Sequence, residues 1–490
     1  MGWFSAPEYW LARLVFERLL GLTYLIAFVG TALQFRALLG ERGLLPVPRF
    51  LQAVPFRRAP SIFHLHYSDR FAVGLAWAGA LFALSVLLGV PQQAPLWLCM
   101  LTWVVMWALY LSFVNVGQTF YGFGWETLLV EAGFLAIFVG NAETAPPLLV
   151  ILLIRWLLFR LEFGAGLIKL RHDPCWRNLS CLDYHHETQP IPNRLSWYFH
   201  RLPRRLHRLE SAANHFVQLF AVFGLFAPQP VASIAGGLIL ATQGWLLLSG
   251  NYAWLNLITV ALAAMSFHNG VLAWVVPVGT PTLEAPPWWF VATVTLVTMA
   301  VAVLSYRPVR NMASRHQLMN ASFDPLRLVN TYGVFGRITR ERYEVVIEGT
   351  DDPALGPGTR WREYELKAKP GDPRRRPRQV APYHLRLDWL MWFAALSPTY
   401  AETWLLPLVE KLLSNDARTL RLLAANPFPD GAPTFVRALL YRYRYTTPEE
   451  RRETGAWWVR ELVGQYLPPV AFYRPGALDV TTAPPAASRG

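Results

Sequence analysis

The sequence predicts an α-helical membrane protein that crosses the bilayer many times and continues into a soluble α+β domain. Hydrophobic residues make up 53% of the 490 positions, and charged residues make up only 16%. The hydrophobic residues occur in long runs. The length of these runs is close to the about 20 residues that a helix needs to span the hydrocarbon core. After Tyr306 these runs give way to shorter segments that are rich in charge, glycine and proline.

The apolar runs predict eight or nine membrane spans within residues 1–306. The fourth run is short, and the sixth and seventh meet at Pro228 and Pro230, which leaves the count between eight and nine. The expected spans are residues 12–36, 71–90, 94–115, 126–142, 146–169, 213–229, 230–249, 252–278 and 288–306.

Basic residues give the chain a formal net charge of +13 and lie mostly beside the expected spans. This placement fits anionic lipid headgroups and topology signals, so we expect membrane lipids as partners and no nucleic acid. Residues 37–70, residues 169–213 and the region after residue 306 are strongly basic. The positive-inside rule therefore predicts that all three regions lie in the cytoplasm.

Residues 307–476 are expected to form the soluble α+β domain, and residues 477–490 a disordered tail. Aromatic and β-branched residues alternate with charges in VNTYGVFGRITRERYEVVIEGT and WREYELKAK, which predicts strands. Apolar residues at helical spacing predict helices in DWLMWFAAL, in residues 400–428, and in PTFVRALLYRYRYT, residues 433–446.

The fifth expected span carries a stripe of charge. Arg155, Glu162 and Lys169 recur every seven residues, so they share one face of a helix. Because charges are costly in hydrocarbon, this face should point into the bundle. One interpretation is buried ion pairs that fix helix packing, with Glu126 and Glu131 as partners of Arg155 or of Arg160, which lies off the stripe. The other makes Lys169 a general base.

The segment between Leu161 and Leu219 is rich in histidine. Its part HHETQPIPN, residues 185–193, is expected to be non-helical because of its two prolines, and it presents His185, His186 and Gln189. The histidines lack the spacing of a zinc site, so the sequence predicts no metal.

From Arg204 onward helical spacing resumes and places His207 and Asn214 on one polar face. This segment is either an interfacial amphipathic helix that leads into the next span, or a helix whose polar face closes over one cavity together with HHETQP. The two interpretations differ in where the polar face points.

The segment HLRLDWLMWF combines arginine, aspartate and tryptophan, a mixture that often anchors partner contacts. It is equally typical of a domain core with one internal ion pair. The candidate binding residues in the whole chain are Arg155, Gln189, His207, Asn214, Arg386, Asp388 and Trp389.

Several segments resemble the lipase maturation factor family. They are GQTFYGFGWETLLVEAGFLAIF, GAGLIKLRHDPCWRNLSCLDYHHETQPIPN, WYFHRLP, HRLESAANHF, LVNTYGVFGRITRERYEVVIEGT and RLDWLMWFAAL. The resemblance implies a multi-pass membrane protein of the endoplasmic reticulum that helps secreted homodimeric lipases to reach their folded, assembled state. It implies no catalytic residues. The expected partner is therefore a secreted client protein such as a lipase.

Two features qualify this resemblance. The arginine-rich, lysine-poor composition is typical of a bacterial protein. A bacterial member is expected in the cytoplasmic membrane, and a eukaryotic one in the membrane of the endoplasmic reticulum. The family also places its carboxy-terminal domain on the exoplasmic side, opposite to the positive-inside prediction. Cys175 and Cys181 could pair in an oxidising compartment or remain free thiols, and a disulfide would favour the family orientation.

A fainter similarity concerns AGLIKL followed by a tryptophan, which resembles the segment around the basic lysine of the vitamin K-dependent gamma-carboxylase. It leads to a second hypothesis, a membrane enzyme acting on a lipid-like or quinone-like substrate. No motif identifies a cofactor, and a lipid or quinone is compatible with this hypothesis. Its candidate catalytic residues are Lys169, His185, His186 and Glu162.

Overall fold

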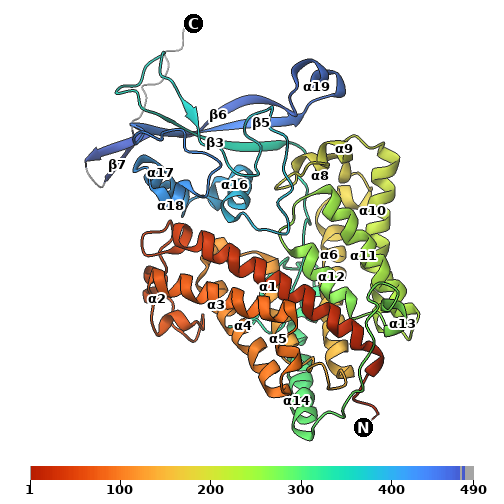
Figure 1. The fold of residues 1–490 in the computed structure, drawn as a ribbon. Coiled ribbons are helices and arrows are strands. Elements are labelled where there is room, and N and C mark those ends of the chain that lie inside the picture. The colour runs from red at the N-terminus through yellow and green to blue at the C-terminus, as the bar shows by residue number, and fades with distance from the viewer. Residues whose placement is uncertain (1, 475–476, 481–490) are drawn as a thin grey trace.

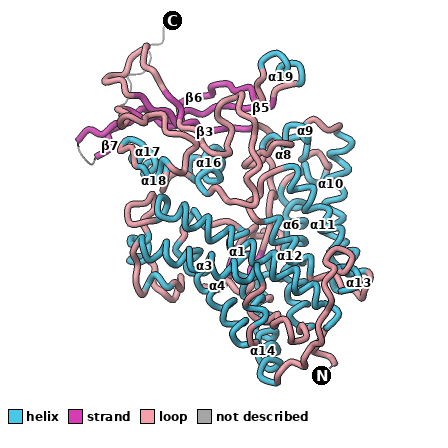
Figure 2. The backbone as a smooth tube through the Cα atoms, in the orientation of Figure 1, coloured by secondary structure: helices cyan, strands magenta, loops and turns pink. Residues whose placement is uncertain are grey.

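The computed structural model describes residues 2–474 and 477–480. A bundle of helices carries a β-sheet at one end, and the N-terminus lies at the opposite end of the bundle (Figure 1). Figure 2 shows helices throughout the bundle and the longer strands together beyond it. The predicted combination of a helical part and a carboxy-terminal part with sheets is therefore present.

The bundle is built from the first three hundred or so residues. Its elements are α1 (Trp10–Leu39), α2 (Val47–Ala53), α3 (Asp69–Leu88), α4 (Leu96–Val116), α5 (Gly124–Ala136), α6 (Leu148–His172), α7 (Pro174–Arg177), α8 (Leu182–Thr188), α9 (Ser196–His200), α10 (Arg204–Leu219), the 3-10 helix η5 (Ala221–Phe226), α11 (Val231–Ser249), α12 (Leu255–Ala264), α13 (Asn269–Leu272), α14 (Trp288–Leu304) and α15 (Tyr306–Ala313).

Five helical segments of the described chain are long and apolar enough to cross a membrane, so the predicted count of eight or nine spans is not confirmed. Helices α5, α10 and α12 have 13, 16 and 10 residues. At about 1.5 Å per residue they are shorter than a core of about 30 Å. Helix α6 is long enough, but charged residues interrupt its apolar sequence. The five segments are Pro7–Leu39, Asp69–Leu88, Leu96–Val116, Val231–Ser249 and Trp288–Ala313.

Small residues allow the long helices to approach closely. A side chain at Gly79 of α3 would overlap the ring of Phe28 on α1, because its Cβ would lie 2.5 Å from that ring. Close backbone approach through glycine is typical of helix pairs in membranes. Phe28 also contacts the rings of Tyr24 and Tyr110. An aromatic core therefore joins α1, α3 and α4.

The larger sheet is antiparallel and has the strand order β4-β3-β5-β6-β7. Helices α16 and α17 lie on the bundle side of this sheet (Figure 1). The strands and helices are β1 (Ala321–Ser322), β2 (Asn330–Thr331), β3 (Arg342–Thr350), β4 (Arg362–Glu363), α16 (Arg386–Leu396), α17 (Leu405–Leu413), α18 (Ala417–Leu420), β5 (Phe435–Tyr445), α19 (Pro448–Thr454), β6 (Trp458–Arg474) and β7 (Ala477–Val480).

The helix expected over residues 433–446 is wrong, because this segment forms strand β5 between β3 and β6. Its second half alternates tyrosine with arginine, and buried Tyr443 and Tyr445 flank exposed Arg444. That period of two overrides the helix-forming residues before it. The expected tail begins at strand β7, and residues 481–490 lie outside the described residues.

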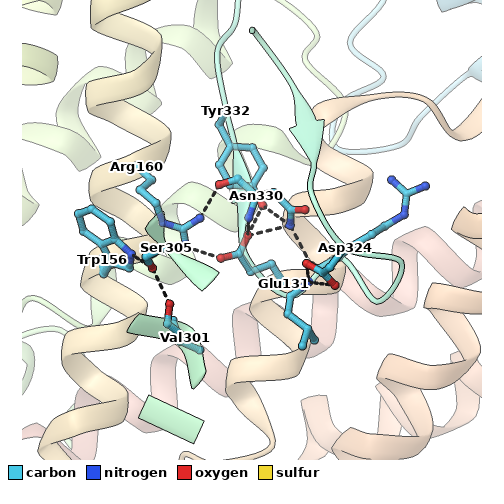
Figure 3. A network of polar contacts seen from close by, with 10 residues as sticks. Glu131, Trp156, Arg160, Val301, Ser305, Asp324, Asn330 and Tyr332 are labelled. Carbon is cyan, nitrogen blue, oxygen red and sulfur yellow. Dashed lines mark hydrogen bonds and ion pairs between the residues drawn. The ribbon is translucent and has the colours of Figure 1, made fainter. Parts of the chain in front are cut away.

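The three basic regions of the sequence lie at the sheet end of the bundle. Asp69, at the start of α3, lies 3.2 Å from Arg418 of α18. Trp197 of α9 donates a hydrogen bond to the carbonyl of Thr446, after β5. A further connection runs deeper, where Arg160 pairs with Glu131 beside strand β2 (Figure 3). The carboxy-terminal part is thus bound to the bundle at several points.

Candidate functional site

The charged residues of the α6 stripe belong to two separate sets of contacts. Arg155 donates from Nε to the carbonyl of Met265 at 3.0 Å and from Nη1 to the carbonyl of Leu225 at 3.2 Å. The carbonyl of Met265 lies at the end of helix α12, and the carbonyl of Leu225 lies within η5. At such positions the helical hydrogen-bond pattern leaves acceptors unpaired. Arg155, a candidate binding residue, therefore satisfies the ends of neighbouring helices.

Lys169 and Glu162 belong to one hydrogen-bonded network. The Nζ of Lys169 donates to Asn214 at 2.7 Å and to Gln218 at 3.0 Å. Gln218 donates to one Glu162 oxygen at 2.9 Å, and Gln243 donates to the other at 3.0 Å. The side-chain amide of Gln218 thus links Lys169 to the Glu162 carboxylate. The network joins side chains of α6, α10 and α11.

This network lies in the wall of a cavity of about 440 Å³, which we call the lateral cavity. The volume falls within the range of about 300–1,000 Å³ that is usual for small-molecule sites. Helix α10 turns its polar face toward this cavity, as the second interpretation of that helix proposed. The lining residues include Glu162, Ala165, Lys169, His185, His186, Leu206, Leu209, Glu210, Ser211, Ala213, Asn214, Gln218, Leu238, Ala241, Gln243, Trp245, Tyr252, Asn256 and Phe335.

The expectation that His185 and His186 lie in a non-helical segment is wrong, because both belong to helix α8. The helix stops just before Gln189, since the residue before a proline avoids the helical conformation. The Nε2 of His185 lies 3.0 Å from the hydroxyl of Tyr252. Burial, and then the neighbouring His186, lower the pKa of His185 to about 3, so its ring is neutral near pH 7.

Gln189 and His207 hold the polar segment in place. Gln189 donates to the carbonyl of Ser249 at 2.9 Å and accepts from the hydroxyl of Tyr252 at 2.8 Å. His207 pairs with Asp183 at 3.0 Å. These contacts tie α8 to the end of α11 and to α10, which shapes the walls of the cavity.

Arg386, Asp388 and Trp389 are buried at the junction of sheet and bundle, with 1%, 1% and 3% of their surfaces exposed. Arg386 forms an ion pair with Glu126 of α5. Asp388 accepts a hydrogen bond from the backbone of Ala368 at 2.7 Å, and burial raises its pKa to about 6. Arg386 and Asp388 therefore join α16 to its surroundings from inside the protein.

Trp389 also borders a second, larger space of about 870 Å³, which we call the aromatic groove. His185 and Phe335 line both this groove and the lateral cavity, so they form part of the wall between them. The residues of the groove include Phe123, Trp125, His185, Gln189, Phe335, Arg337, Trp389, Trp392, Phe393, Leu396 and Tyr400.

Cys175 and Cys181 form a disulfide in the loop that follows α6. Asp173 lies close to both sulfur atoms, but bonded sulfurs lack the thiolate that binds a metal. Trp176, inside this loop, places its ring 4.9 Å from the Nζ of Lys169. The disulfide loop thus supplies one side of the lysine environment.

Sequence reasoning missed Gln243 and Asn256, which contribute to the network from α11 and α12. Asn256 donates to Gln243 at 2.7 Å, and Gln243 donates to Glu162. Each is a single amide within an apolar run, and polar residues at such positions are expensive in a membrane. A lone amide in an apolar run is therefore the sequence feature that could have identified Gln243 and Asn256 as functional candidates.

Comparison with known proteins places the chain among relatives. A model of the lipase maturation factor transmembrane domain matches residues 11–274, and a model of the lipase maturation factor C-terminal domain matches residues 328–468. Lipase maturation factor 1 of Bos taurus is 41% identical over 95% of this chain and 90% of the relative. The human protein of that name is 39% identical over 95% and 88%.

Human lipase maturation factor 2 is more distant, at 29% identity over 95% of this chain and 83% of the relative. No solved structure matches the chain. The matches to both domain models extend over most of the sequence, and the membrane helices agree with the transmembrane description. The chain therefore belongs to the lipase maturation factor family.

Proposed function

We propose that this protein is a membrane-bound maturation factor that assists the folding or assembly of secreted lipases. The names of its relatives support the client class. On this proposal residues 1–306 anchor the protein in the membrane and residues 307–476 face the client. The arginine-rich composition supports the cytoplasmic membrane of a bacterium as its location.

The aromatic groove is the observation that carries a client-binding role. Its wall contains rings from the bundle and from α16, including Trp125, Trp392 and Phe393. Tyr400 and Leu396 at its edge are 53% and 39% exposed, so the groove reaches the protein surface. Aromatic residues of this kind are enriched at binding hot spots. An apolar segment of an incompletely folded lipase fits this surface.

Co-expression with a secreted lipase tests this proposal. The double variant Trp392→Ala with Tyr400→Ala removes two rings of the groove, and we expect secreted lipase activity to fall at least fivefold. The control is Tyr198→Ala, an exposed ring on α9 outside the groove. Both variants must accumulate in the membrane as the wild type does. Full lipase secretion with the double variant would contradict the groove as the client site.

A substitution at Lys169 distinguishes this proposal from the alternative, which is a membrane enzyme that uses Lys169 as its base. Arginine keeps the positive charge but cannot act as a base near pH 7. If the protein is a maturation factor that performs no chemistry at Lys169, the Lys169→Arg variant should still support lipase secretion. Loss of secretion in a variant that still folds would instead support the enzyme.

A further inference from the structure

The lateral cavity contains polar atoms that no described residue satisfies. The Nδ1 of His186, the hydroxyl of Ser211 and the Oδ1 of Asn256 have no hydrogen-bond partner within the described chain, and the Nε2 of His186 has only a Glu210 oxygen at 3.6 Å. The three side chains are at most 1% exposed, and all three line the cavity. A buried polar group without a partner costs about 1–3 kcal/mol. Such a set is typical of a site that a ligand completes.

The mouth of the cavity is apolar and lies between α10 and α11. Leu206 and Leu209 line it from α10, and Leu238 and Trp245 line it from α11. All four are exposed, Leu209 to 64% and Trp245 to 42%. Helix α11 is one of the membrane-spanning candidates, so exposed apolar side chains beside it face acyl chains. The cavity therefore opens sideways into the bilayer.

The charged residues along the cavity wall disfavour an anionic ligand. Lys169 already donates to Asn214 and Gln218. Two carboxylates, Glu162 and Glu210, accompany this cation in the lining. An added phosphate or carboxylate would therefore meet a single cation that is already hydrogen-bonded, beside two acidic side chains, in a medium of low dielectric constant. A ligand with an uncharged polar group meets no such cost.

We propose that the lateral cavity binds one membrane lipid with an uncharged, hydroxyl-bearing headgroup, of the acylglycerol class. Its hydroxyl groups donate to Asn256 and accept from Ser211 or His186, and its acyl chains leave between α10 and α11. No covalent step is involved. The site is independent of the client role proposed above, because the aromatic groove lies on the other side of His185 and Phe335.

Photolabelling of the full-length protein in phospholipid nanodiscs tests the proposal. The probe is a diacylglycerol that carries a diazirine on one acyl chain. We expect mass spectrometry to find the label on α10 or α11, and unlabelled diacylglycerol to compete. Ala241→Trp, and independently Ala213→Trp, place a large ring at the cavity wall and should reduce labelling at least fivefold. Gly237→Trp is the matched control on α11, because open space surrounds its Cβ.

The headgroup assignment has its own measurement. Ser211→Ala removes an unpartnered hydroxyl, so it should fold normally but lose at least half of the rise in Tm that added diacylglycerol produces. Equal labelling by a phosphatidic acid probe would overturn the uncharged class. Labelling that neither tryptophan variant reduces, or an unchanged rise in Tm for Ser211→Ala, would overturn the site.

Discussion

Arg160 and Glu131 form an ion pair inside the protein, and each side chain is 1% exposed. Glu131 also accepts from the backbone of Asn330 at 3.0 Å and from the hydroxyl of Tyr332 at 2.7 Å (Figure 3). Burying two charges is costly, and these hydrogen bonds to Glu131 offset part of the lost hydration. The pair thus fixes strand β2 against α5 and α6, and it matches the partner expected from the sequence.

Replacing one partner should leave an uncompensated buried charge. We expect Arg160→Met to lower the free energy of unfolding by about 3–5 kcal/mol, because Glu131 keeps its charge without the guanidinium. The measurement is thermal unfolding in detergent. The exposed Arg205 provides the control, since Arg205→Met should change stability by less than about 0.5 kcal/mol. Equal Tm values for the two variants would count against the pair.

Two buried histidines and the half-buried His200 predict loss of stability in acid. Burial lowers the pKa of His185 to about 3, and of His200 and His384 to about 4. The unfolded chain therefore binds protons that the folded chain excludes. The stabilisation is complete above pH 6.5 and is lost as the pH falls toward 4. Asp388 and Glu187 act in the opposite sense at the acid end of this range, because burial raises the pKa of each carboxyl.

Thermal unfolding at pH 7, 6 and 5 measures this dependence, and we expect Tm to fall at each step. For His384 alone, a change from the ordinary 6.5 to about 4 corresponds to about 3 kcal/mol at low pH. His384→Gln should accordingly flatten the dependence. A Tm that rises from pH 7 to pH 5 would rule out the neutral histidines.

At the scale of elements, local pattern predicted strands β3 and β4 and helix α16, but it assigned a helix to a segment that is a strand. The helix expected in DWLMWFAAL corresponds to α16, whereas the expected helix over 433–446 is strand β5. The alternation of tyrosine and arginine indicates a strand only in the second half of β5. The apolar first half is a strand because it pairs with β3 and β6, and a single sequence does not show which distant segment will pair. In the candidate site, Lys169, Glu162 and Asn214 could be predicted from periodicity, but Gln243 comes from a helix with no such pattern.

The disulfide loop should stabilise the surroundings of Lys169. Removing the bond in a double variant, Cys175→Ser with Cys181→Ser, should lower the free energy of unfolding by about 2 kcal/mol, since the closed loop is short. A reductant should lower the Tm of the wild type and leave that of the double variant unchanged. Cys99→Ala, which removes the free buried thiol, should retain the response to reductant.

At the scale of the whole molecule, one end of the bundle gathers the sheet and the basic segments. Single cysteines at exposed Arg57, Arg205 and Glu449 should therefore react with an impermeant thiol reagent from the same side of the membrane. A cysteine at exposed Thr280 should react from the other side, because the nearby Glu284 pairs with residues before α6, at the far end. Labelling of the first three from different sides would contradict this arrangement.

The same labelling decides the orientation that the sequence left open. Reaction from the cytoplasm would follow the positive-inside prediction, and reaction from the exoplasmic side would follow the family orientation and the disulfide. The number of basic residues beside the spans is a poor guide to the orientation of this protein, because several arginines have structural partners inside it. Arg155 and Arg386 are examples, since each is bound to groups of the bundle.

Helix α10 has its polar side chains inside and its apolar side chains outside. Leu209 and Phe216 are exposed, whereas Ser211 and Gln218 are buried. The isolated helix is too polar to leave the translocation channel for lipid, and it is not among the membrane-spanning candidates. It can enter the bilayer only when α6 and α11 are already there to receive its amides. We therefore expect a delayed insertion step, in which α10 stays at the membrane surface until α11 has been synthesised.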